Sequence, residues 1–109
     1  MNISISLTEN GSELHAKLAG EIDAYTAPKV KESLHPYAEK SGINMVVDLK
    51  DVSYMDSTGL GVFVGLFKAL KAENGNLILT GLSERLERLF EITGLADVMN
   101  INTEVEGGV

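Results

Sequence analysis

Apolar and polar residues alternate in two segments near the start of the chain. Residues 3–8 read Ile-Ser-Ile-Ser-Leu-Thr, and residues 14–18 read Leu-His-Ala-Lys-Leu. A period of two is typical of strands that bury one face. Asn10-Gly11 stands between the two segments and is a frequent hairpin turn. The pattern therefore predicts a β-hairpin at the start of the fold.

The period changes to helical spacing from Ala27, where Thr26 stands in the cap position and Pro28 in the first turn. Apolar residues then recur three or four apart up to Ala38, which predicts an amphipathic helix. Proline inside a helix removes a backbone donor and clashes with the preceding turn. We therefore expect Pro36 to kink or interrupt this helix.

The second half of the chain alternates between apolar runs and helical patterns. The apolar runs at residues 45–47 and 77–79 predict buried strands, the first of them central in the sheet. Helices are predicted from about residue 58 to 73 and from Ser83 to Gly94, with a last short strand at 98–101.

The resulting order is β-β-α-β-α-β-α-β, which predicts an α/β fold with a mixed β-sheet and helices packed on it. We expect residues 1–102 to form one domain. Residues 103–109, with Gly107-Gly108, are expected to form a flexible C-terminal tail.

Composition restricts the classes of function. The chain has 109 residues, a hydrophobic fraction of 44%, no cysteine and a net charge of −7. Such an acidic chain repels the phosphate backbone of nucleic acids. Without cysteine, and with His15 and His35 as the only imidazoles, no metal site or cofactor is expected. No apolar run is long enough for a bilayer and no signal peptide is visible, so we expect a cytoplasmic protein without membrane contact.

The segment Asp56-Ser57-Thr58-Gly59 falls at a strand exit and a helix entry. Functional sites of open α/β sheets gather where strands end and helices begin. Ser57 is expected to cap the helix with its hydroxyl, and most serines in this position do only that.

The helix after Ser57 is unusually apolar. No charged residue occurs between Thr58 and Phe67, and small residues recur every four positions, at 61, 65 and 69. A helix that is apolar on all sides is either wholly buried or partly exposed for a partner. Both interpretations stay open, and the second predicts that Val62 or Phe63 contributes to a partner surface.

A hydroxyl beside a docking surface suits a phosphorylation switch. Phosphate would add about −1.5 to −2 charges at Ser57, which a helix N-terminus tolerates. A docked partner would not tolerate these charges, because docking would strip water from the phosphate next to the negative charge of Asp56.

Several segments together resemble a known family. Residues 20–23, 26–28, 48–49 and 52–61 are similar, in order and spacing, to the bacterial anti-sigma factor antagonists of the STAS fold. The likeness covers nearly the whole chain. The likeness, which includes residues 83–95, is strongest to the antagonists of the sigma-B stress-response systems of Gram-positive bacteria.

The resemblance implies a partner-switching role in stress-responsive transcription. Ser57 matches the residue that the anti-sigma factor, itself a serine kinase, phosphorylates in the family. The unphosphorylated form would bind that kinase and release the sigma factor, and a PP2C-type phosphatase would remove the phosphate. We expect a monomer or weak dimer, with Thr58 as a second hydroxyl. The expected partner-binding residues are Asp23, Tyr25, Asp56, Thr58, Gly59, Gly61, Val62 and Phe63.

Alternative functions fit the chain less well. An aspartic protease motif would place Gly directly after the hydroxyl residue, where Thr58 stands. A serine hydrolase would need Gly at position 55, which is Met, and a His after Ser57, whereas both histidines precede it. We therefore expect no enzymatic activity. The remaining alternative is a STAS scaffold module of a larger stress-signalling complex.

Overall fold

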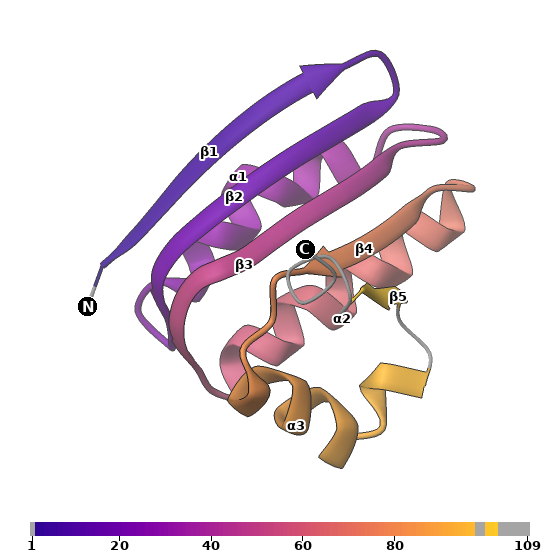
Figure 1. The fold of residues 1–109 in the computed structure, drawn as a ribbon. Coiled ribbons are helices and arrows are strands. Elements are labelled where there is room, and N and C mark those ends of the chain that lie inside the picture. Colours follow the sequence, from indigo (N-terminus) through magenta and orange to yellow (C-terminus); the bar gives the residue numbers. More distant parts are fainter. Residues whose placement is uncertain (1, 98–99, 103–109) are drawn as a thin grey trace.

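The structure, a computed structural model, describes residues 2–97 and 100–102. Five strands form one sheet in the order β1-β2-β3-β4-β5, so that each strand lies beside its neighbours in the chain (Figure 1). β1 and β2 are antiparallel, and all later pairs are parallel. The strands are β1 (Ile3–Asn10), β2 (Glu13–Ile22), β3 (Asn44–Met55), β4 (Asn76–Thr80) and β5 (Asn100–Asn102).

The predicted hairpin is confirmed. Asn10 pairs with Glu13, so the turn consists of Gly11 and Ser12. Gly11 has a φ of 63°, a conformation that glycine adopts without steric cost. The turn thereby sets the β1–β2 register and turns Ile3 and Leu18 towards the same buried layer.

Helices α1 (Ala27–Ala38) and α2 (Ser57–Ala72) lie together behind the sheet in Figure 1, and α3 (Glu84–Ile92) lies at its lower end. A short 3₁₀ helix, η1 (Leu95–Asp97), follows α3. Strand–helix–strand crossovers are right-handed, and successive crossovers here advance in the same direction across the sheet. This geometry places α1 and α2 on one face. None of the described helices is long and apolar enough to span a membrane.

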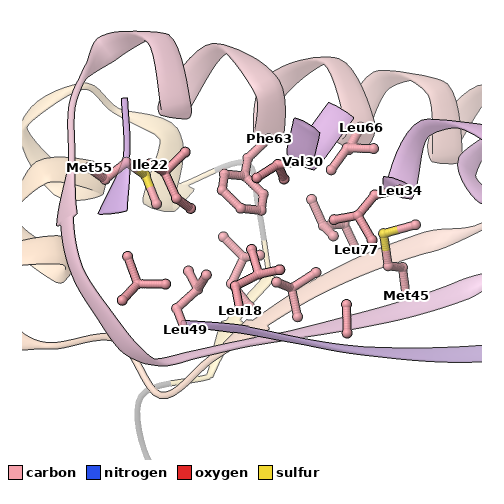
Figure 2. Packing of buried hydrophobic residues seen from close by; sticks show 14 of the residues in the cluster. Leu18, Ile22, Val30, Leu34, Met45, Leu49, Met55, Phe63, Leu66 and Leu77 are labelled. Atoms are coloured by element: carbon pink, nitrogen blue, oxygen red, sulfur yellow. The ribbon is translucent and has the colours of Figure 1, made fainter. Parts of the chain in front are cut away.

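The core lies between this face of the sheet and the helices. Alternate residues of β3, such as Met45, Val47 and Leu49, are fully buried. Figure 2 shows Phe63 pointing from α2 toward the sheet, where Leu18 and Leu49 lie. One face of the sheet therefore supplies most of the hydrophobic core.

The other face of the sheet is open. Val46 and Ile78 are only half-buried, because they point away from the helices. The sequence correctly predicts both strands and the central place of β3. The predicted buried strands are buried on one face only, since only every second side chain faces the core.

Local predictions at the helix ends differ in outcome. Pro36 does not interrupt α1, which continues to Ala38. The Ser83 hydroxyl caps α3 by accepting a hydrogen bond from the Leu86 N–H over 3.2 Å, as expected. The last strand is Asn100–Asn102 rather than 98–101, and residues 98–99 lie outside the described part. The expected tail, 103–109, also lies outside it.

Candidate functional site

The candidate site lies where β2 and β3 end side by side. The parallel register pairs Ile22 with Met55, the last residues of the two strands. The Asp56 N–H then donates to the Ile22 carbonyl over 3.3 Å. Two chain segments far apart in the sequence, 23–26 and 56–59, are thereby joined at the carboxyl edge of the sheet.

Asp56 is the cap of α2. Its backbone is extended, and its Oδ1 accepts hydrogen bonds from Thr58 N–H at 3.0 Å and Gly59 N–H at 3.3 Å. The expectation that Ser57 caps the helix is therefore wrong. Ser57 is the first helical residue and is exposed, so its hydroxyl is not required for the helix start.

Gly59 holds the start of α2 against the strand ends. A Cβ at this position would lie 2.7 Å from Met55 Cγ and 2.8 Å from Ile22 Cγ2, closer than real Cβ contacts. Gly59 is also buried. Its expected place on a partner surface is corrected: its role is close packing, which sets the position of Ser57.

Asp23 organises the loop between β2 and α1. Its Oδ1 accepts hydrogen bonds from Tyr25 N–H at 2.9 Å and Thr26 N–H at 3.0 Å. The Thr26 hydroxyl in turn accepts from Asp23 N–H and donates to the Glu21 carbonyl over 2.7 Å. The Thr26 side chain makes no capping hydrogen bond to α1, contrary to the sequence expectation.

Opposing effects act on the Asp23 carboxyl, which is only 7% exposed. Burial raises its pKa, but the N–H donors of Thr26 and Tyr25 favour the charged form. Together they hold the pKa of Asp23 below its ordinary value. The carboxylate therefore stays ionised and keeps the loop fixed.

This loop presents an aromatic pocket beside Asp56. Tyr25 is 86% exposed and Tyr54 is 44% exposed, both unusual for such large side chains. They line a pocket of about 350 Å³ together with the acidic residues Glu21, Asp23 and Asp56. Exposed tyrosines and carboxylates in one hollow suit the binding of a partner that carries basic and apolar groups.

The faces of α2 divide into core and surface. Phe63 is fully buried, so its expected contribution to a partner surface is wrong. Val62 is half-buried and packs against the edge of the core, while Thr58 and Gly61 are exposed. The helix is therefore not wholly buried, and a contribution of Val62 to a partner surface stays a prediction.

The structure brings Tyr25, Asp23 and Asp56 to one pocket, and their part in partner binding stays a prediction. It adds Glu21 and Tyr54, which were not among the expected site residues. Tyr54 lies next to Glu21 only through the β2–β3 register, so no local pattern indicates this pair. Among the described residues, no group of three or more His, Cys, Asp or Glu side chains could hold a metal ion.

Comparison with protein families places the chain in a defined class. The STAS domain family matches residues 4–108, nearly the whole length, and the chain belongs to this family. Its expected STAS fold is thereby confirmed.

Within the family, relatives of one kind match the chain from end to end. It is 54% identical to the anti-sigma-B factor antagonist of Bacillus subtilis, covering 100% of this chain and 99% of the relative. It is 59% identical to the protein of the same name from Listeria monocytogenes, covering 98% and 94%. The Staphylococcus aureus protein of that name is 47% identical, with 97% and 100% covered.

Solved structures agree on the fold. A putative anti-sigma factor antagonist from Thermotoga maritima superposes with a TM-score of 0.82 at 20% identity, covering 95% of this chain and 90% of that one. The Bacillus antagonist SpoIIAA in its phosphorylated form gives a TM-score of 0.73 at 24% identity, covering 95% and 96%.

Proposed function

We propose that this protein is an anti-sigma factor antagonist whose binding to an anti-sigma factor kinase is switched off by phosphorylation of Ser57. The observation that carries the proposal is the exposed Ser57 hydroxyl, which Asp56 relieves of the capping role at the start of α2. The full-length similarity to anti-sigma-B factor antagonists supports it.

In the unphosphorylated state, the pocket around Tyr25 and Tyr54 would receive the partner. Aromatic side chains dominate the binding energy of many interfaces, because they bury a large area with few rotatable bonds. The carboxylates of Glu21 and Asp56 would attract basic groups on the kinase. The sigma factor would be released when the kinase is occupied in this way.

Phosphorylation of Ser57 would reverse the affinity. The helix start tolerates the new negative charge, because the helix dipole favours an anion at this end. Docking would require the phosphate to lose water beside Asp56, a like charge. A thousandfold loss of affinity needs only about 4 kcal/mol.

A PP2C-type phosphatase would restore the active form, making the protein a positive regulator of stress-responsive transcription. Support comes from the fold neighbour SpoIIAA, which was solved in both phosphorylated and unphosphorylated forms. We propose that the chain acts in the cytoplasm, as a monomer or weak dimer, without a cofactor or catalysis of its own.

The test is incubation with Mg-ATP and the anti-sigma factor kinase of the same organism, followed by phosphosite mapping. We expect phosphate on Ser57 and almost none in the Ser57→Ala variant. Phosphate mainly on Thr58, or none at all, would contradict the proposal. Co-purification with a very large assembly instead of the kinase would favour the scaffold alternative.

A further inference from the structure

A groove separates α1 from the first three turns of α2. Lys31 and His35 line it from α1, and Thr58, Gly61, Val62 and Gly65 line it from α2, around a volume of about 250 Å³. It begins at Thr58, directly beside Ser57, so an occupant of the groove would approach the phosphoacceptor. It is distinct from the tyrosine pocket, with which it shares no lining residue.

The floor of the groove is formed by glycines that the fold itself does not require. A Cβ at Gly61 or Gly65 would meet nothing within 4 Å, whereas one at Gly59 would clash with Met55 and Ile22. Both lie in regular helix with negative φ, where glycine is less favourable than alanine. Packing therefore explains Gly59, whereas neither packing nor backbone conformation explains Gly61 or Gly65.

The charge of the groove is opposite to that of the tyrosine pocket. Lys31 is exposed at its edge, and the ion pairs among the described residues engage Lys17, Lys40 and the two histidines, but not Lys31. His35 is held towards Glu39 through Nδ1 at 3.4 Å. The tyrosine pocket contains three carboxylates. The two hollows thus present opposite charges in a chain of net charge −7.

We propose that the α1–α2 groove receives an acidic side chain of the anti-sigma factor kinase. The carboxylate would pair with Lys31, and its aliphatic stem would lie against Gly61 and Gly65. The inference rests on the proposed function and deepens it. A phosphate on Ser57 would then repel this acidic side chain directly, in addition to the cost of its own desolvation.

The glycines allow a test that separates binding from folding. Gly61→Ala and Gly65→Ala add one methyl group to an open groove, so each variant should melt higher than the wild type, by about 4 °C. The same methyl group should obstruct the occupant. We expect each variant to bind the purified kinase at least ~10-fold more weakly in calorimetric titration.

Reversing the charge of Lys31 tests whether the occupant is acidic. Lys31→Glu should weaken binding at least ~10-fold, and this loss should shrink as salt rises, because screening reduces the repulsion. Lys17→Glu is the control, since it makes the same charge change on the open face of the sheet. It also removes the ion pair of Lys17 with Asp51 at 3.8 Å, so its melting temperature is measured alongside. It should bind within about twofold of the wild type.

Other results would each contradict one part of the proposal. If wild type binds and the Gly61→Ala and Lys31→Glu variants bind equally well, the groove is not part of the interface. If the glycine variants lose affinity but Lys31→Glu does not, the occupant is not acidic. Equal losses of affinity for Lys17→Glu and Lys31→Glu would mean that the net charge of the chain, and not the groove, causes the effect. No binding by the wild type would overturn the proposed function, and the groove proposal with it.

Discussion

The Asp56 carboxylate accepts a hydrogen bond from the Thr58 backbone N–H over 3.0 Å and thereby caps the helix that carries Ser57. A phosphoacceptor that capped the helix itself would have to replace that contact with one made by its phosphate oxygens whenever it is phosphorylated. Here the cap, Asp56, and the proposed phosphoacceptor, Ser57, are adjacent but separate residues. The start of α2 can therefore keep its structure in both states of the proposed switch.

This separation predicts different effects of two alanine substitutions on stability. Asp56→Ala should cost about 1 kcal/mol of unfolding free energy, as is typical of a lost N-cap. Ser57→Ala should stay within about 0.5 kcal/mol of the wild type. Urea denaturation measures both, and Asp56→Asn serves as the control because asparagine caps equally well. A larger cost for Ser57→Ala than for Asp56→Ala would assign the cap to the serine.

Val62 and Phe63 are neighbours in sequence with different burial. Phe63→Ser should cost at least about 3 kcal/mol, because it removes a fully buried ring from the core. Val62→Ser should cost at least about 2 kcal/mol less, since Val62 is only half-buried. We also expect Val62→Ser to weaken kinase binding. Thermal melts and titrations of the two variants compare these effects, and equal destabilisation would place Val62 in the core.

Tyr25 is the most exposed of the large apolar side chains given above. Tyr25→Ala should leave the unfolding free energy within about 0.5 kcal/mol of the wild type. It should weaken kinase binding by about 2 kcal/mol, or roughly 30-fold. Tyr25→Phe keeps the ring and should retain most of the affinity. Wild-type affinity of the alanine variant would exclude the tyrosine pocket from the interface.

The lowered pKa of Asp23 predicts a dependence of stability on pH. Since the folded-state pKa lies below the ordinary value of 3.8, the unfolded chain takes up protons first as the pH falls. The stabilisation is therefore fully present above pH 3.8 and is lost as the pH falls through the folded-state pKa. Asp23→Asn should be less stable than the wild type near neutral pH, and the difference should narrow in acid. Urea unfolding at a series of pH values measures this difference in unfolding free energy. A difference that stays constant with pH would mean that the ionisation of Asp23 does not contribute to stability.

The sign of the switch is tested at Ser57. Ser57→Ala should bind the kinase about as well as the wild type, Ser57→Asp more weakly, and the phosphorylated protein most weakly. The order follows charge, because aspartate carries one negative charge and phosphoserine about −1.5 to −2. Titration of all three forms checks it. Tighter binding of the phosphorylated form would show that arginines of the partner hold the phosphate.

Hydrophobic periodicity predicted the strands and helices, since each pattern depends on neighbouring residues alone. The cap of α2 was not predictable in this way, because Asp56 and Ser57 are both good caps and stand next to each other. The choice depends on Asp56 N–H reaching the carbonyl of Ile22, a contact between distant segments.

The burial of individual strand residues and the composition of the pocket could likewise not be predicted from local patterns. The runs around Val46 and Ile78 are apolar throughout, so they do not reveal which face of the sheet the helices leave open. The pairing of Glu21 with Tyr54 depends on the register of β2 and β3, which are separated by α1. A single sequence gives residue types at the edge of the sheet but not which of them meet.

Since every strand lies beside the one that precedes it in the chain, the sheet can grow from its N-terminal hairpin as the ribosome delivers the chain. The pocket residues, from Glu21 to Asp56, all belong to the part made first, and α2 follows immediately. Leu77 and Phe90, which complete the core, arrive later. Because a small domain is stable only as a whole, the pocket takes its final form only when these later residues have joined the core.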